Sequence, residues 1–246
     1  RPGDQPVRMK DGKRILAVVP ARSGSKGIPD KNMQPLGGRS LIARAAELLR
    51  STDCSWIDRA IISTDSASYA DEAKRHGLDA PFRRPPEFSH DKAGAVETMI
   101  HAMTEAETHF GERFDVVLIV EPTCPLRRAE DIARAVDLLL ASGAESVVTV
   151  SRADTKFHPH KLLRMADDQL GFYDPAGAAV KARQSLEPLF FRNGACYALT
   201  RACLLDRQAV FTDNTRGLLI ERDLVNIDEP IDLEFARFLV EQKGLA

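Results

Sequence analysis

The sequence predicts an α/β protein with a doubly wound, mostly parallel sheet and a small inserted lobe. Short, continuous apolar runs alternate with segments whose apolar residues recur at helical spacing, which is the pattern of β-loop-α units. A polar stretch with three prolines, residues 152–189, interrupts this alternation and is too long for a simple connection. With 246 residues the chain can bury a substantial core, so we expect one α/β domain with an elaboration.

The first half of the chain begins with the clearest strand. Residues 15–19 are apolar and largely β-branched, as in a strand buried on both faces, and Pro20 cannot continue the ladder. Leu41, Ala45, Leu48 and Leu49 then fall at helical spacing. The next elements are expected as a strand at 57–63, a helix from near Ser66, a helix at 95–109 and a strand at 116–120.

The second half continues the alternation on both sides of the polar stretch. Apolar residues spaced along 132–140 predict a helix, and residues 146–150 predict a strand. After the insertion, residues 190–199 return to the core, and residues 224–228 are expected to form the last strand. A final amphipathic helix is expected from Ile231, Phe235, Phe238 and Leu239. Parallel strands joined by helices require crossovers, which are right-handed.

Composition excludes several classes of protein. A net charge of −2 and a pI near 6.4 argue against a nucleic-acid partner, whose phosphates call for a basic surface. No apolar run is long enough to span a bilayer, and residues 1–14 form a polar N-terminal extension unlike a secretory signal, so a cytoplasmic protein is expected. Residues 1–9 receive no function. The four cysteines show no metal-site spacing and are interpreted as free thiols.

The loop after the first strand, ARSGSKGIPDKN at residues 21–32, is the strongest functional feature. It lies at the carboxyl end of a buried strand, where ligands bind in open α/β sheets. Gly24 and Gly27 allow backbone N–H groups to approach an anion, while Arg22, Lys26 and Lys31 supply positive charge. The loop matches neither GxxxxGK[ST] nor GxGxxG, so a P-loop NTPase and a Rossmann dehydrogenase are both disfavoured. A phosphorylated nucleotide is the ligand that this loop predicts.

The same loop resembles the nucleotide-binding loop of the acylneuraminate cytidylyltransferases, also called CMP-sialic acid synthetases. Further matching segments follow in order along nearly the whole chain: STD at 63–65, RPPEFSHD at 84–91, EPTCPLR at 121–127, RNGACY at 192–197 and NIDEPIDL at 226–233. The related Kdo cytidylyltransferases carry a loop closer to ARxxSTRLPGK, so the SGSKG core favours the sialic-acid branch. The resemblance implies a nucleotide-diphospho-sugar transferase-like core from residues 15–151 and 190–246. It implies that residues 152–189 form a dimerisation lobe that reaches the partner's sugar site.

The resemblance also assigns roles to individual residues. Triphosphate binding falls to Arg22, Ser23, Lys26, Lys31 and Asn32, and cytosine recognition to Arg84 and to backbone groups near Ala93. Arg22 and Lys31, together with Asp228, are the expected catalytic residues. Mg²⁺ is the expected cofactor, held by Asp228 with Asn226, because this ion prefers hard oxygen ligands. The sugar-binding residues are expected to be Glu121, Thr123, Lys161, Arg183 and Gln184.

The expected reaction couples CTP to the anomeric hydroxyl of a nonulosonic, sialic-acid-like α-keto sugar acid, giving a CMP-sugar and pyrophosphate. The expected enzyme is a homodimer that binds CTP and an acidic nine-carbon sugar, with active sites completed across the interface.

Five positions depart from the family pattern: Ala95, Glu121, Cys124, Phe191 and Asn226. Many relatives carry Gln at position 121, Ser at 124, Arg at 191 and a DID segment in place of Asn226-Ile227-Asp228. Two alternatives therefore stay open, namely a cytidylyltransferase for Kdo or another acidic metabolite, and an inactive CTP-binding relative. The acceptor sugar, the general base and the number of metal ions are left undetermined by the sequence.

Overall fold

A computed structural model describes residues 10–90, 93–182, 184 and 186–244. Its core is a six-stranded sheet in the order β10-β6-β9-β5-β1-β4. The strands are β1 (Ile15–Pro20), β4 (Arg59–Ser63), β5 (Val116–Ile119), β6 (Ser146–Arg152), β9 (Phe190–Thr200) and β10 (Thr215–Leu219). Only β9 runs antiparallel to its neighbours. The expectation of a mostly parallel sheet is confirmed.

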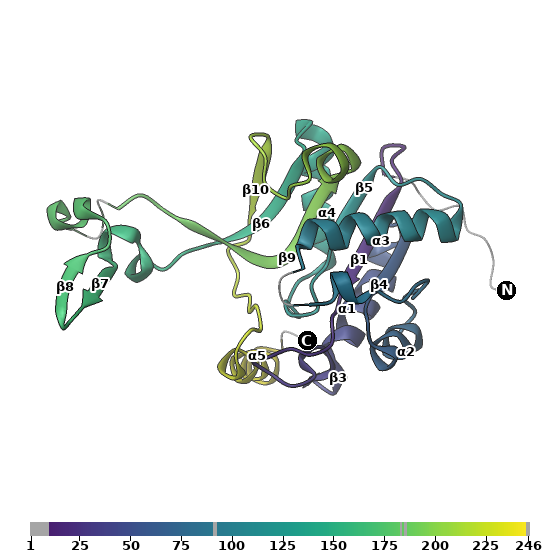
Figure 1. The fold of residues 1–246 in the computed structure, drawn as a ribbon, viewed down its shortest axis with the longest axis horizontal. Coiled ribbons are helices and arrows are strands. Elements are labelled where there is room, and N and C mark those ends of the chain that lie inside the picture. The colour runs from purple at the N-terminus through teal and green to yellow at the C-terminus, as the bar shows by residue number, and fades with distance from the viewer. Residues whose placement is uncertain (1–9, 91–92, 183, 185, 245–246) are drawn as a thin grey trace.

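Helices cover both faces of this sheet, as expected for a doubly wound fold (Figure 1). One face packs against α1 (Leu41–Arg50), α2 (Ala67–Arg75) and α4 (Ala129–Ser142). The other face packs against α3 (Ala95–Phe110) and the short helix Cys203–Arg207. Successive residues of β1 divide between the two cores, with Ala17 facing the first and Leu16 the second. None of the helices in the described part of the chain combines the length and apolar character that crossing a membrane requires.

The last expected strand is wrong, because residues 224–228 form an extended loop and not a strand. The last strand is β10, at the edge of the sheet, and the chain then leaves the sheet and runs to α5 (Pro230–Lys243). The apolar pattern of the loop has another cause, since Val225 and Ile227 are buried in a separate core beneath α5. The amide of Ile227 also donates to the carbonyl of Thr123, which fastens this loop beside the end of β5.

The buried side of α5 differs from the expected one. The helix packs through Leu233, Ala236, Leu239 and Val240, whereas Ile231, Phe235 and Phe238 are exposed. Of the four apolar residues that predicted this helix, only Leu239 contributes to the core. The apolar residues lie on two sides of the helix, so helical spacing alone does not say which side is buried.

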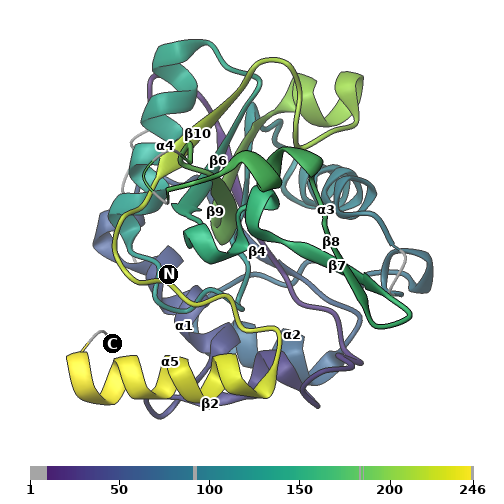
Figure 2. The ribbon, with the colours of Figure 1, turned by 90° about the vertical axis from the view of Figure 1, so that its left-hand side faces the viewer.

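The insertion forms a lobe that projects from the core on a neck made by the end of β6 and the start of β9 (Figures 1 and 2). Its main element is a hairpin of β7 (Leu163–Ala166) and β8 (Gln169–Phe172). Leu163 pairs with Phe172 and Met165 with Leu170, so these four apolar side chains share one face of the hairpin. All four are between 41% and 70% exposed, so none of the described residues of the chain covers this face.

The remaining short elements connect these layers. They are β2 (Pro35–Leu36), β3 (Arg39–Ser40) and the 3-10 turns Lys31–Met33, Thr52–Cys54, Pro86–Phe88, Thr155–Phe157, Pro159–Lys161 and Pro175–Ala179. Residues 10–14 of the polar extension also contact the core, since Lys10 forms an ion pair with Asp137 on α4 at 2.8 Å.

Candidate active site

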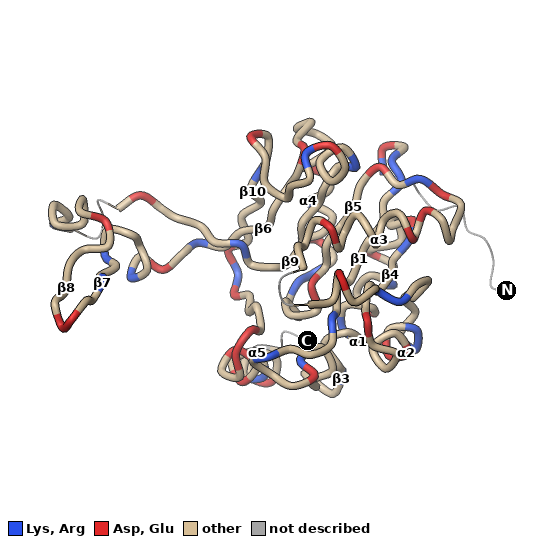
Figure 3. The backbone as a smooth tube through the Cα atoms, viewed as in Figure 1, with Lys and Arg blue, Asp and Glu red and all other residues tan. Residues whose placement is uncertain are grey.

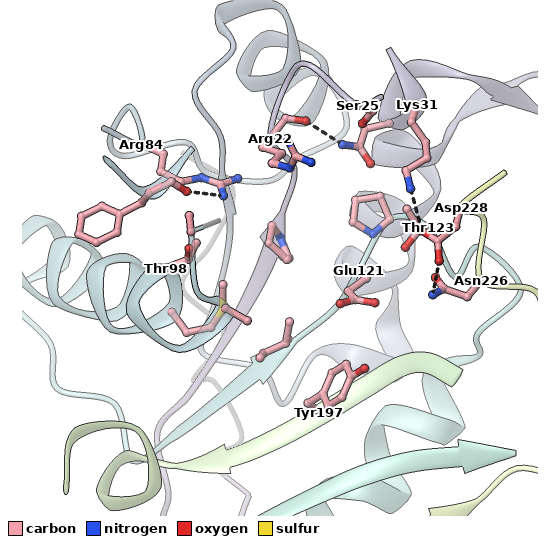
Figure 4. Close-up of a pocket in the computed structure, with 18 of the residues that line it drawn as sticks. Arg22, Ser25, Lys31, Arg84, Thr98, Glu121, Thr123, Tyr197, Asn226 and Asp228 are labelled. Carbon is pink, nitrogen blue, oxygen red and sulfur yellow. Dashed lines mark hydrogen bonds and ion pairs between the residues drawn. The ribbon is translucent and has the colours of Figure 1, made fainter. Parts of the chain in front are cut away.

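The carboxyl ends of β1, β4 and β5 meet at one edge of the sheet and open into a cavity of about 390 Å³. Parallel strands place their C-terminal loops side by side, which is where open α/β sheets bind ligands. The volume is in the range of small-molecule sites. Loops from every part of the core contribute to the lining, which includes Arg22, Ser25, Lys31, Asn32, Arg84, Ala93, Thr98, Glu121, Thr123, Arg192, Tyr197, Asn226 and Asp228 (Figure 4).

The basic loop after β1 is held in place by Ser23. Its backbone N–H and its hydroxyl donate to the two oxygens of Asp65, at 2.7 and 2.6 Å. Burial alone would raise the pKa of Asp65, but these two hydrogen bonds hold it below its usual value. The hydroxyl of Ser23 is thus committed to the end of β4, and the cavity is lined by Ser25 instead. These bonds give Ser23 a positioning role in the loop, and its contact with triphosphate stays a prediction.

Asn32 and the two glycines fix the rest of the loop. Asn32 is buried and donates through Nδ2 to the carbonyl of Arg22 at 3.3 Å, which holds the loop in a turn. Gly24 adopts a φ of 71°, a conformation that favours glycine. Gly27 has a packing role in the structure, and the expected approach of its backbone to an anion stays a prediction. A Cβ at Gly27 would lie only 2.7 Å from the carbonyl oxygen of Asp228, so glycine permits the loop to pack against the segment before α5.

Lys31 and Asp228 connect the basic loop to the segment before α5. Nζ of Lys31 lies 3.0 Å from Oδ1 of Asp228, and Asn226 donates through Nδ2 to Oδ2 of the same carboxylate at 3.4 Å. The backbone N–H of Asp228 donates to Asp232, which caps the start of α5. Asn226 and Asp228 are therefore neighbours, and a loop and not a strand brings them together. Asp232 is occupied as a helix cap.

Arg84 lies on the opposite side of the cavity from Asp228 (Figure 4). Its side chain is buried, and its Nη2 donates to the carbonyl of Ser63 at 2.6 Å while Nη1 donates to that of Phe88 at 3.3 Å. Burial lowers the pKa of Arg84 to about 10, with a further lowering by Arg22. The guanidinium therefore stays charged at neutral pH. Its neighbour Arg83 is exposed and donates to the backbone carbonyl of Asp65.

Glu121 lies between these two sides, at the end of β5 (Figure 4). Burial raises the pKa of its carboxyl group and nearby Asp228 adds to the effect, whereas Arg127, Arg192 and Lys31 oppose it. Tyr197 on β9 faces the same space, and burial followed by the proximity of Glu121 raises its pKa to about 12. This part of the cavity therefore offers a polar ligand the carboxyl group of Glu121, the phenol of Tyr197 and the guanidinium of Arg192.

Four of the expected site residues in the described part of the chain do not line the cavity, and Ser23 is one of them. Lys26 belongs to the basic loop but is exposed and outside the lining. Lys161 and Gln184 are exposed on the lobe, at a distance from this cavity along the neck (Figure 1). Arg183 lies outside the described residues. Within one chain, the structure thus brings most of the residues expected to bind nucleotide and metal to one cavity and does not bring the described lobe residues Lys161 and Gln184 to it.

Arg192 is the main lining residue that the sequence did not assign. A one-residue offset from the family position suggested that it would face the other side of β9. The structure instead places Arg192 at the cavity and leaves Phe191 exposed. The register of β9 against β6 shifts between Val148 and Val150, and such an irregularity re-aims side chains. Ser25, His90, Thr98 and Tyr197 also line the cavity without an assigned role; the first two and Tyr197 lie in motifs that the sequence singled out, whereas Thr98 lies outside them.

Comparisons with known proteins agree with this arrangement. The family model described as cytidylyltransferase matches residues 16–245. A CMP-N,N'-diacetyllegionaminic acid synthase of Legionella pneumophila is 32% identical over 237 residues, covering 93% of this chain and 97% of that protein. A pseudaminic acid cytidylyltransferase of Campylobacter jejuni is 25% identical and covers 91% of this chain and 95% of its own length.

A solved structure shares the fold at lower identity. The structure of CMP:2-keto-3-deoxy-manno-octonic acid synthetase complexed with CTP aligns with a TM-score of 0.69 and 14% identity, over 94% of this chain and 99% of that one. The family model covers nearly the whole chain, and the cavity combines a buried arginine, a basic glycine-containing loop and an exposed carboxylate at the end of parallel strands. From the sequence match, the fold and the site together, the chain belongs to the cytidylyltransferase family.

Proposed function

We propose that this enzyme transfers CMP from CTP to the anomeric hydroxyl of a nonulosonic, sialic-acid-like α-keto sugar acid. The observation that carries the proposal is the layout of one cavity, in which Arg84, the Arg22–Lys31 loop and the Glu121–Asp228 region follow one another. A nucleotide with its base at Arg84 and its triphosphate at the loop directs its α-phosphate toward Glu121 and Asp228. The names of the relatives, which make CMP-activated nonulosonic acids, supply the acceptor class.

The chemistry is an in-line displacement at phosphorus. The anomeric oxygen attacks the α-phosphate, the bond to the β-phosphate oxygen breaks, and pyrophosphate leaves while the hydroxyl proton passes to solvent or to a base. Arg22 and Lys31 line the cavity where the leaving pyrophosphate gains charge. Fixed cations at such a position stabilise the transition state more than the ground state. Alignment of two bound substrates supplies the rest of the rate enhancement.

Magnesium is part of the proposal. Asp228 and Asn226 present oxygen atoms at the end of the cavity, and Mg²⁺ usually takes one or two carboxylates together with substrate phosphates. A buried Oδ1 on Asn226 has no hydrogen-bond partner among the described residues, so the donor set fits a cation. When bound, the ion neutralises phosphate charge as pyrophosphate departs.

The lobe supports a homodimer. A two-stranded hairpin is marginal by itself, and the apolar face of Leu163, Met165, Leu170 and Phe172 is uncovered. Acidic residues mark the tip between β7 and β8, whereas the two strands are uncharged apart from Arg164 (Figure 3). We propose that a second copy covers this face and that Lys161, Arg183 and Gln184 then act at the partner's acceptor site. The reaction is placed in the cytoplasm, where CTP is made.

The decisive assay measures CTP-dependent pyrophosphate release with a panel of nonulosonic acids, with Kdo as a separate acceptor and UTP as the nucleotide control. We expect release with CTP and at least one nonulosonic acid. Release with Kdo alone, or no release with any acceptor, would refute the proposed acceptor class. CTP binding without turnover at saturating Mg²⁺ would identify an inactive relative.

The dimer is tested by a matched pair of substitutions in the hairpin. Met165→Glu places a charge on the apolar face, while Arg164→Glu places the same residue on the opposite face of the same strand. Sedimentation should show monomers for Met165→Glu and dimers for Arg164→Glu. Equal sedimentation of the two variants would contradict the role given to this face.

A further inference from the structure

Asn226 lies between two carboxylates. On one side its Nδ2 donates to Oδ2 of Asp228 at 3.4 Å. On the other side its Oδ1 is buried and has no hydrogen-bond partner among the described residues. Glu121 lines the same cavity beside this pair, in the region between Arg84 and Asp228 (Figure 4).

Gly194 shows how closely the two side chains approach each other. A Cβ added to Gly194 would lie 2.8 Å from Oε2 of Glu121 and 3.3 Å from Oδ1 of Asn226. Both oxygens therefore border the same small space beside the backbone of β9. Gly194 also has a φ of +72°, so this residue is glycine for its conformation as well as for the room it leaves.

The amide of Asn226 cannot satisfy both carboxylates. An amide has one donor end and one acceptor end, and the two ends are distinguished only by their surroundings. If Nδ2 faces Asp228, then Oδ1 faces Glu121; if the amide is turned over, then Oδ1 faces Asp228. In either orientation the amide oxygen and a carboxylate oxygen border the same space, and a cation placed there is a partner that both can bind. Lys31 is already at the other oxygen of Asp228.

We propose that Glu121, Asn226 and Asp228 form one divalent-cation site, with Glu121 as its second carboxylate. The proposal rests on the function above and extends the pair of metal residues expected from the sequence. Three oxygen donors from a strand end and a loop suit a hard cation such as Mg²⁺ or Mn²⁺. In this proposal Glu121 binds the ion, in addition to the sugar-binding role expected from the sequence.

The proposal explains two departures from the family pattern together. Where many relatives carry Gln at position 121 and Asp at position 226, this chain carries Glu and Asn, and the structure places the two positions at one space. The exchange moves a carboxylate from the loop to the end of β5 while the charge of the site stays the same. The loss of charge at Asn226 is then compensated by Glu121.

The test measures the affinity of the full chain for Mn²⁺ in the absence of nucleotide. The electron paramagnetic resonance signal of the free ion reports how much Mn²⁺ is unbound. Glu121→Gln should raise the dissociation constant at least about tenfold, because even the loss of a residue behind a ligand costs about 10- to 100-fold. Glu241→Gln makes the same change at an exposed position on α5 and should leave the constant unaltered. The double variant Glu121→Gln/Asn226→Asp returns the carboxylate to the loop and should restore an affinity near that of the wild type.

Calorimetry with CTP on the same samples separates this proposal from the proposed function. Failure of the wild type to bind CTP would refute the function. If the wild type binds CTP, three results would overturn the shared cation site. They are the absence of Mn²⁺ binding, an unaltered Mn²⁺ dissociation constant in Glu121→Gln, and no recovery of Mn²⁺ affinity in the double variant. Recovery in the double variant also shows that weaker binding in the single variant does not result from misfolding.

Discussion

Arg84→Lys is the most informative substitution in the nucleotide part of the cavity. Arg84 is buried, and its two terminal nitrogens donate in different directions, to the carbonyls of Ser63 and Phe88. A guanidinium reaches both because it is a planar fork, whereas an ammonium is a single point on a flexible stem. Lysine at this position keeps the charge but cannot reproduce the fork.

The size of the effect follows from these contacts. A hydrogen bond from a charged group contributes about 1.5–3 kcal/mol, and a buried carbonyl left unpaired costs a similar amount. We therefore expect Arg84→Lys to lower the free energy of unfolding by about 1.5–3 kcal/mol. If the same fork holds the cytosine ring, loss of one such bond weakens CTP binding about 10- to 150-fold, since each 1.4 kcal/mol is a factor of ten.

The adjacent arginine provides the control. Arg83 is exposed and contacts only a backbone carbonyl through its side chain in the described structure, so Arg83→Lys should change stability by no more than about 0.5 kcal/mol. Urea unfolding measures the stability of both variants, and calorimetry measures their affinities for CTP and UTP. The reasoning is refuted if the two variants behave alike, or if Arg84→Lys binds CTP as tightly as the wild type does.

Three further predictions concern two residues of the basic loop and the thiol of Cys124. Ser23→Ala should cost about 1–2 kcal/mol at pH 7, because Asp65 loses a hydrogen bond to its charged form. The folded pKa of Asp65 lies below its unfolded value near 3.9, so this stability is complete above about pH 4 and is lost as the pH falls through the folded value. Urea unfolding of the wild type and the variant should therefore show a smaller difference in stability at pH 3 than at pH 7. An equal difference at both pH values would contradict this prediction. Lys31→Met should lower kcat for pyrophosphate release about 10²- to 10³-fold, as for other fixed groups that stabilise developing charge, and a kcat near that of the wild type would remove Lys31 from the chemistry. Burial raises the pKa of Cys124 to about 11, so its thiol is protonated at neutral pH and Cys124→Ala should retain turnover; an inactive but folded variant would reopen a nucleophilic role.

The sequence predicted the fold well because the main elements have local causes. The run at 15–19 is apolar on every residue, and the structure buries it completely as β1. The helix from Ser66 begins where the Ser66 hydroxyl accepts from the amide of Tyr69, a cap that is visible in the sequence. Residues 224–228 were wrongly predicted as a strand because burial beneath α5 produces the same apolar pattern as burial in a sheet.

The candidate site was predicted less completely, for the same physical reason. Arg22, Lys31, Arg84 and Asp228 lie in conspicuous motifs, and the structure gathers all of them around one cavity. Ser23 sits in the same motif, yet its hydroxyl is taken by Asp65, 42 residues away along the chain. Motif position says which loop reaches a site, but contacts with other loops decide which side chain of that loop faces the ligand.

By itself the sequence determined most of the core strands and helices, the basic loop and the cytidylyltransferase family, since each depends on residues that are close together or on motifs in fixed order. Only the tertiary structure decided that Glu121 and Asn226 border one space beside Gly194, and that Arg192 faces the cavity. Positions 121 and 226 are far apart in the chain, and nothing local to either reveals the other. They meet because β5 and β9 are neighbours in the sheet and because the backbone of Ile227 bonds to Thr123.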